Sequence, residues 1–260
     1  MPSVLAIAAH PDDIEFVMAG TMLLLQGRGW DLHYLNIADG SCGAMETGPT
    51  ETAKIRLEEA RHAAASLGAT FYPPLCPDLE IRYDVSLLRK VAAVVRQAKP
   101  QIVLTHSPVD YMEDHQEACS LAVAASFTYS MPNFKTIPDT SIYAGPVTIY
   151  HAQPHGNRTP LGDPVEPHFA IDIQSVIERK MTALECHASQ KDWLDVTQGM
   201  GSFVKTMCDL CNEVGRMTGR FAIAEGWRRH HHLGYCGPDD DPLADALQNE
   251  IHRLKPARKA

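Results

Sequence analysis

A histidine and two aspartates stand close together in the segment LAIAAHPDDIEF, residues 5–16. A catalytic zinc ion commonly takes three protein ligands of imidazole and carboxylate type and leaves a fourth position for water. The metal lowers the pKa of that water toward about 7, so hydroxide becomes available near neutral pH. A cation would also explain how the adjacent carboxylates of Asp12 and Asp13 tolerate one another. His10 and Asp13 are therefore candidate ligands of a catalytic metal.

A second pair of such residues, Asp114 and His115, occurs far along the chain in DYMEDH. His10, Asp13 and His115 would together supply the three ligands of a zinc site. Asp12 lies next to a ligand and could take the proton of the water as general base. These residues predict a hydrolytic metal centre.

The same residues admit other interpretations. A strand that ends in HPDD can form a turn in which Pro11 fixes φ and an aspartate caps the helix that follows. Two histidines and one carboxylate can also bind ferrous iron in an oxygenase, and Asp12 rather than Asp13 would then be the ligand. Such an oxygenase needs a double-stranded β architecture, so the order of the elements bears on the choice.

Strand and helix patterns alternate through the first half of the chain. Apolar runs predict strands at residues 4–9, 32–37 and 101–106, and helical patterns predict helices at residues 15–28, 51–67, 84–98 and 114–129. Thr50 is the expected N-cap of the second helix, after a loop rich in glycine and small polar residues. This alternation favours βαβ units and a parallel sheet, which is an α/β fold and not the oxygenase architecture.

Binding loops of a parallel sheet lie at the carboxyl ends of its strands. LAIAAHPDD leaves the first strand in the same way that IVLTHSPVDYMEDH leaves a later one. We therefore expect His10, Asp13 and His115 to meet at one edge of the sheet, although the chain separates them widely.

The second half of the chain has a different character. Residues 130–168 are rich in proline and predict irregular structure with a few extra strands. Residues 172–217 have a helical pattern, and the tail from Asp239 predicts one short charged helix. The segment AEGWRRHHHLG, residues 224–234, predicts an exposed basic turn, with a sugar or subunit contact at its tryptophan as the alternative.

The seven cysteines are odd in number and scattered, which is not typical of a disulfide framework and suits a reducing cytoplasm. Cys208 and Cys211 form one CxxC, but a structural zinc site would require a second pair. Both lie in a helical pattern, so we predict buried thiols on a helix face.

Composition places the chain among ordinary globular proteins, with 260 residues, 45% hydrophobic and 21% charged. The formal net charge of -9 disfavours a nucleic-acid partner, because such binding needs clustered lysine and arginine. We see no signal peptide and no apolar stretch of the roughly 18 residues that a membrane helix needs. We expect a cytoplasmic protein with no membrane partner and one domain over residues 1–260.

The motif AAHPDDIEFVMAG, with DH at the start of a later helix, resembles the PIG-L or LmbE-like family of zinc-dependent N-deacetylases. The signature of that family is AHPDDE, followed much later by HPDH. Ile14 stands between Asp13 and Glu15, a spacing that also occurs in the family. RLEEARHAAASLG and KMTALECHASQ resemble two further helices of the family, so the likeness extends over most of the chain.

The resemblance implies a Rossmann-like, parallel-sheet, three-layer fold with additional C-terminal helices and strands. Residues 1–130 would form the metal-binding core, and residues 131–260 would complete the site. It also implies one zinc ion per subunit, or another divalent metal, bound by His10, Asp13 and His115. Asp12 would be the general base.

The activity implied is removal of an N-acetyl group from an amino-sugar substrate, such as an N-acetylglucosamine derivative, by a homo-oligomer. An amidase acting on a thiol or sugar conjugate is a related alternative. A sugar-binding module without catalysis is disfavoured, because binding alone needs no general base such as Asp12. Asp114 matches an aspartate of the family motif and would hydrogen-bond Asp12 or a ligand imidazole, or cap the helix that begins there.

One departure from the family pattern concerns proton transfer. Many members carry a second histidine three residues before the last ligand, where this chain has Met112, and a methionine cannot donate a proton. His155 is the first candidate to replace it, ahead of His151, and both could instead be surface or structural residues. The resemblance further implies that Arg56 and Asp78 contact substrate hydroxyls, with a solvated helix face as the alternative for Arg56.

Overall fold

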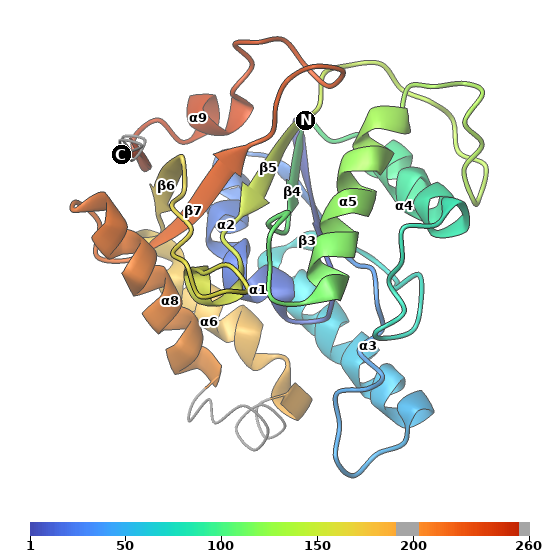
Figure 1. Cartoon of the computed structure of the whole chain (residues 1–260), viewed down its shortest axis with the longest axis horizontal. Coiled ribbons are helices and arrows are strands. Elements are labelled where there is room, and N and C mark those ends of the chain that lie inside the picture. The colour runs from blue at the N-terminus through green and yellow to red at the C-terminus, as the bar shows by residue number, and fades with distance from the viewer. Residues whose placement is uncertain (191–202, 255–260) are drawn as a thin grey trace.

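The computed structural model of the protein describes residues 1–190 and 203–254. A mixed sheet runs through its centre (Figure 1). Its strand order is β3-β2-β1-β4-β5-β7-β6-β8. The strands are β1 (Ser3–Ala8), β2 (Asp31–Asn36), β3 (Ala69–Tyr72), β4 (Ile102–Thr105), β5 (Thr148–Ala152), β6 (Phe169–Asp172), β7 (Ala224–Arg229) and β8 (Ile251–Arg253). β1 to β5 pair in parallel, whereas β7, β6 and β8 pair antiparallel to their neighbours.

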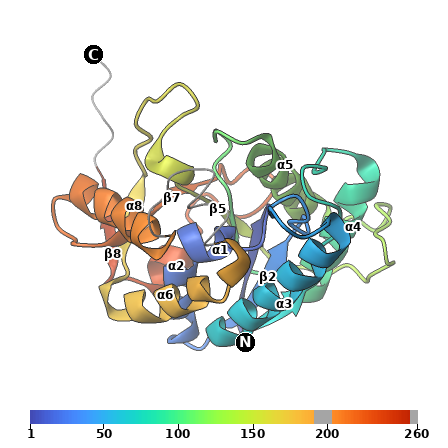
Figure 2. The same ribbon diagram turned by 90° about the horizontal axis from the view of Figure 1, so that it is seen from below.

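Helices cover both faces of the sheet (Figure 2). One face carries α1 (Asp13–Val17), α2 (Ala19–Gln26), α3 (Pro49–Leu67), α6 (Ile177–Glu185) and α8 (Phe203–Thr218). The other face carries α4 (Val85–Ala98) and α5 (Glu113–Thr128). The remaining elements are the short helix α9 (Pro242–Ala246) and the 3-10 turns η1 (His155–Asn157) and η2 (Gln174–Val176). The predicted three-layer α/β fold with additional C-terminal elements is confirmed.

The first strand shows why this arrangement forms. Every residue of β1 is buried, as expected for a parallel strand with helices on both faces. Val4 and Ala6 belong to the core on the α2 side, and Leu5 and Ile7 to the core on the α5 side. Successive side chains point to opposite faces of a strand, so one apolar run fills two cores.

The helix predicted at residues 15–28 is divided into α1 and α2 at Met18, whose backbone is not helical (φ −133°, ψ −26°). The carboxylate of Glu225 accepts the backbone N–H groups of Gly20 and Thr21, in the first turn of α2, at 2.8 Å. Lys180 donates to the carbonyl of Phe16 in α1 at 2.9 Å and pairs with Glu225. The break leaves backbone groups at the end of α1 and the start of α2 without helical partners, and this buried ion pair supplies hydrogen bonds to them.

Two predicted N-caps are wrong. The N-cap of α3 is Gly48, not Thr50, because Pro49 already has the fixed φ that suits the first helical position. The N-cap of α5 is Met112, so Asp114 lies inside the first turn and does not cap this helix.

The second half of the chain matches part of the expectation. β5 is one of the extra strands predicted within residues 130–168, and the helical pattern of residues 172–217 gives α6 and α8. Residues 191–202 of that pattern lie outside the described residues. The tail forms the predicted short helix, α9, and then the unpredicted strand β8. No helix of the described segments is long and apolar enough to cross a membrane.

The prediction of an exposed basic turn at residues 224–234 is wrong for its first half. These residues begin as β7, which lies between β5 and β6, and the side chain of Trp227 is fully buried. Cys211 is buried in α8 and Cys208 is half-buried, and both are free thiols. The prediction of helix-face thiols is thus confirmed, although only Cys211 is fully enclosed.

Candidate metal centre

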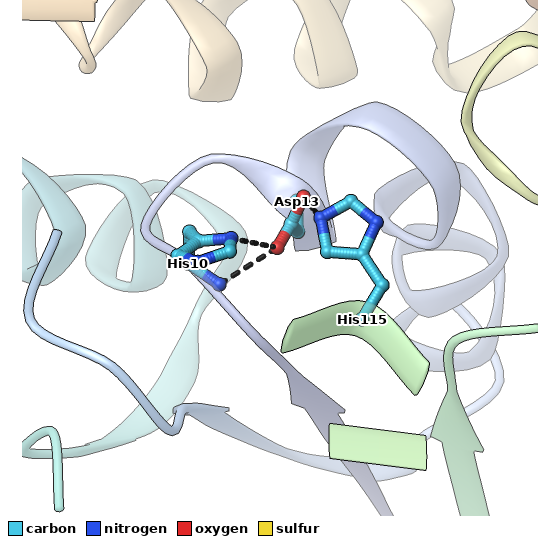
Figure 3. A group of neighbouring side chains, drawn as sticks. All are labelled: His10, Asp13 and His115. Carbon is cyan, nitrogen blue, oxygen red and sulfur yellow. Dashed lines mark hydrogen bonds and ion pairs between the residues drawn. The ribbon is translucent and has the colours of Figure 1, made fainter. Parts of the chain in front are cut away.

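The predicted metal ligands come together at one edge of the sheet. His10 follows β1, Asp13 is the first residue of α1, and His115 lies in the first turn of α5 (Figure 3). β1 and β4 are parallel neighbours, so the segments that leave them open onto the same edge. All three side chains are buried, and one donor atom from each lies within 4.8 Å of the others.

The distances within this set suit a shared ion. Asp13 Oδ2 lies 3.4 Å from His10 Nδ1, and Asp13 Oδ1 lies 3.3 Å from His115 Nε2. Charge-assisted hydrogen bonds between such groups are usually shorter, about 2.7–2.9 Å. Two ligand atoms on a tetrahedral zinc ion, each about 2.0–2.2 Å from it, are roughly 3.3 Å apart. The residues present therefore fit a zinc ion.

Two carboxylates orient the histidines. Asp114 Oδ2 lies 3.1 Å from His10 Nε2, and Asp110 Oδ1 lies 2.9 Å from His115 Nδ1. When each outer nitrogen donates its proton to a carboxylate, the lone pair of the inner nitrogen faces Asp13. This is the usual way in which neighbouring groups fix the tautomer of a metal-binding histidine.

The cluster attracts positive charge. Burial alone would lower the pKa of His115, but the charge of Asp13 and the hydrogen bond to Asp110 raise it to about 9. The pKa of His10 is also raised despite burial, by hydrogen bonds to Asp114, Asp13 and Asp78. These carboxylates therefore favour either protons or a cation at the imidazoles.

Asp12 differs from Asp13 in conformation and in charge state. Its backbone is left-handed (φ 111°), a region that is strained for any residue except glycine. Burial raises the pKa of Asp12 to about 6, Arg56 opposes this rise, and the charge of Asp13 adds to it. A carboxylate with a pKa close to neutral is suited to take and hold a proton.

Arg56 is buried rather than solvated, so the alternative of an exposed helix face is wrong. Its guanidinium donates to Asp12 Oδ2 at 3.2 Å, to the carbonyl of Pro11 at 2.5 Å and to that of Gly40 at 3.2 Å. Gly40 has a positive φ of 68°, and a Cβ there would lie 2.4 Å from the guanidinium. Arg56 thus packs between the turn that carries Asp12 and the glycine-rich loop.

A pocket of about 280 Å³ opens beside the ligands. Asp12, Arg56, Asp78 and His155 line it, as do Phe16, Tyr111, Met112 and Gln190. Asp78 accepts from the N–H of Cys42 at 3.0 Å and lies 3.2 Å from His10 Nε2. The predicted substrate residues therefore share one space with the metal ligands.

The two candidate histidines have different surroundings. The ring of His155 packs against the rings of Phe16 and Tyr111, at centroid distances of 5.3 and 5.7 Å, and lines the pocket. His151 is buried away from the pocket, with His230 Nδ1 2.9 Å from its Nε2. Of the two, His155 alone lines the pocket.

Several residues of the site escaped the sequence reasoning. His106 stacks on His115 at 4.2 Å between ring centroids, and Asp110 binds the outer nitrogen of His115. Both lie in the segment that leaves β4, a signal that was present but not used. Gln190 lies in the segment KMTALECHASQ, and its amide donates to the carbonyl of Gly43 at 3.0 Å. Its place at the pocket depends on long-range packing.

The chain is similar to several known proteins. A family model described as PIG-L, GlcNAc-PI de-N-acetylase, matches residues 5–126. Diacetylchitobiose deacetylase of Thermococcus kodakarensis is 31% identical over 194 residues, which are 72% of this chain and 69% of the relative. 4-Oxalmesaconate hydratase of Pseudomonas putida is 31% identical over 197 residues, which are 73% of this chain and 74% of the relative. The solved structure of N,N'-diacetylchitobiose deacetylase from Pyrococcus horikoshii is similar over 93% of this chain and 88% of the deacetylase chain. The sequence identity is 24% and the TM-score is 0.73, which shows that the two proteins share a fold.

Proposed function

Because this chain belongs to the PIG-L, or LmbE-like, family of de-N-acetylases, we propose that it removes the N-acetyl group from an amino-sugar substrate by zinc-activated water. An N-acetylglucosamine derivative is the substrate class that we favour. The observation that carries the proposal is the meeting of His10, Asp13 and His115 at ligand spacing, with Asp12 beside them in an open pocket.

Each residue of the centre has a role in this chemistry. His10, Asp13 and His115 would hold the metal, which when bound supplies a Lewis acid that polarises the amide carbonyl and acidifies water. Asp12 takes the proton of the attacking water, and its pKa of about 6 lets it hold that proton near neutral pH. Arg56 donates a hydrogen bond to Asp12 Oδ2 and so restricts the orientation of that carboxylate.

We propose that His155 delivers a proton to the leaving nitrogen, in place of the histidine that Met112 replaces. Its imidazole lines the pocket, and within residues 1–190 and 203–254 its ring nitrogens have no hydrogen-bond partner. Burial and the charge of His115 lower the pKa of His155, so its ring is mostly neutral near neutral pH and would need to gain a proton during the reaction before it passes one to the leaving nitrogen. Asp78 retains lone pairs for a substrate hydroxyl. The predicted substrate contact of Arg56 stays a prediction.

Hydration of a carbon–carbon double bond is a second candidate, because one relative of equal identity is named a hydratase and Met112 removes a proton donor from the site. Both reactions need activated water. They differ in product, since deacetylation releases a free amine and acetate, whereas hydration removes a conjugated double bond.

The deciding experiment offers the zinc-loaded protein a panel of N-acetylated sugars and conjugates and, separately, a panel of unsaturated carboxylic acids. Amine release is measured with a fluorogenic amine reagent, and hydration is followed as loss of ultraviolet absorbance. Metal content is determined on the same sample, and His115→Ala serves as the variant expected to lose the metal. Amine release that disappears with the metal supports deacetylation. Hydration without any amine release would overturn it in favour of the second candidate.

We also expect this protein to form a homo-oligomer and to act in the cytoplasm without a nucleic-acid or membrane partner. Light scattering of the purified protein measures the mass of the assembly and tests the first of these expectations.

A further inference from the structure

Asp110 lies at the junction of two segments that the chain brings to the metal centre separately. Its side chain is fully buried between β4 and α5. Oδ1 is 2.9 Å from His115 Nδ1 and accepts from the N–H of Met112 at 3.3 Å. Oδ2 accepts from the backbone N–H of His155 at 3.2 Å. One carboxylate therefore contacts a metal ligand with one oxygen and the proposed proton donor with the other.

We propose that Asp110 is a positioning residue that fixes the separation between the metal ligand His115 and the pocket residue His155. The part of this inference that concerns proton transfer rests on the function proposed above, and the part that concerns metal binding does not. Asp110 itself contacts neither substrate nor metal in this assignment.

The topology explains why such a tie is needed. β4 and β5 are parallel neighbours, with Thr105 opposite His151, but the two segments that leave them have no shared backbone ladder. The turn η1 after β5 carries His155 and contains Gly156 at a positive φ of 79°, so its direction is not set by a regular helix. Among the described residues, Asp110 is the one side chain that hydrogen-bonds His155.

The chemistry of the carboxylate suits this role. A buried carboxylate needs several donors to offset its lost hydration, and Asp110 has three. An asparagine would offer one acceptor oxygen instead of two and an N–H₂ group that repels a donor. With asparagine at this position, either His115 or the His155 turn must lose its contact.

The test compares Asp110→Asn with Asp241→Asn. Asp241 is a matched control, since it is also a largely buried aspartate, and it accepts from Tyr150 at 2.7 Å and from Arg253 at 2.6 Å away from the pocket. Zinc affinity of each metal-free protein is measured by competition with a chromogenic chelator. Hydrogen exchange of the peptide that covers residues 153–157 reports the N–H of His155.

For Asp110→Asn we expect zinc affinity to fall about 10–100-fold, as is typical when a residue behind a metal ligand is replaced, or exchange at residues 153–157 to accelerate, or both. Asp241→Asn should change neither. If Asp110→Asn matched the control in both measurements, the proposal would be wrong.

Kinetics then test the link to proton transfer. With a substrate found for the wild type, the loss of kcat caused by Asp110→Asn should be smaller in a His155→Gln background than in the wild type, while KM changes little. Equal losses in both backgrounds would contradict the coupling of Asp110 to His155. A wild type that binds zinc but releases no amine would count against the proposed function only, because zinc affinity and exchange still report on Asp110.

Discussion

Two buried charge clusters lie at opposite ends of α1, and they differ in how completely their members satisfy one another. At the C-terminal end, Lys180 contacts Glu225 and a backbone carbonyl, and Glu225 also accepts two backbone N–H groups and Thr21 Oγ1. At the N-terminal end, Asp13 Oδ2 accepts the backbone N–H of His10 at 2.7 Å, but the carboxylate lies 3.3–3.4 Å from the imidazole nitrogens of His10 and His115, beyond good hydrogen-bond contact. The first cluster is complete by itself, whereas the imidazoles of the second need either protons or a bound cation to balance its carboxylates. The difference separates a structural ion pair from a candidate binding site.

The largest effect should come from the second cluster without unfolding the protein. Asp12→Asn keeps the shape of the side chain but removes the base, so we expect kcat to fall by about 10²–10⁴-fold, a range typical of a general base. Zinc content, measured by atomic emission, should stay at the wild-type level, because Asp12 is not a ligand. Turnover that survives this change would show that another group takes the proton.

The first cluster should behave in the opposite way. Lys180→Met leaves the carboxylate of Glu225 buried without its cation, and we expect the free energy of unfolding to fall by about 3–5 kcal/mol. Urea denaturation measures this loss. Adding Glu225→Gln in the same chain removes the unpaired charge and should restore much of the stability. A double variant that is no more stable than Lys180→Met would mean that the charge pair is not the cause.

Removal of the metal should lower stability by an intermediate amount. Zinc that binds only the folded state at 100 times its Kd stabilises that state by about 2.7 kcal/mol. Thermal unfolding with and without a strong chelator should therefore show a lower Tm for the metal-free protein. His115→Ala supplies the control, since its Tm should not respond to the chelator. A chelator response in that variant would mean that the ion stabilises the fold elsewhere.

The smallest predicted effect concerns the backbone of Asp12. Glycine tolerates φ 111° and alanine does not, so Asp12→Gly should be more stable than Asp12→Ala by about 1–2 kcal/mol. Both variants lack the carboxylate, and both should be inactive. If the two variants have the same denaturant dependence of unfolding, their denaturation midpoints give the difference in the free energy of unfolding. Equal midpoints would indicate that the turn relaxes and stores no strain.

The meeting of the three predicted ligands could be derived from the sequence because it depends on local rules. His10 and Asp13 follow an apolar strand directly, and His115 follows a later one, so the geometry of a parallel sheet brings them to one edge. Histidine and aspartate can be recognised as possible metal ligands from their residue type. Only the direction of the strands had to be known to predict that these residues lie close together.

Other features could not be predicted, because their causes lie far away in the chain. The break at Met18 follows from Lys180 and Glu225, which come from α6 and β7. Trp227 is buried because its indole packs into the core on the α2 side and donates to Thr21 Oγ1 at 2.9 Å, although its neighbours in sequence are arginines and histidines. Asp110 was present in the segment DYMEDH, but its role depends on the turn that carries His155. In each case the decisive partner is remote in sequence.

The reversal of strand direction at β7 has a practical consequence. β7 runs against β5, so the segment that follows Arg229 emerges at the edge of the sheet away from the metal centre. A separate hollow lies there, bordered by His168, Asp241 and Arg253, and it shares no residue with the pocket beside the ligands. A fluorescent label or surface tether attached within the exposed residues 238–240 would leave the mouth of the pocket clear. Substrate could then be supplied to the immobilised protein, and different metal ions could be loaded onto the same sample in turn.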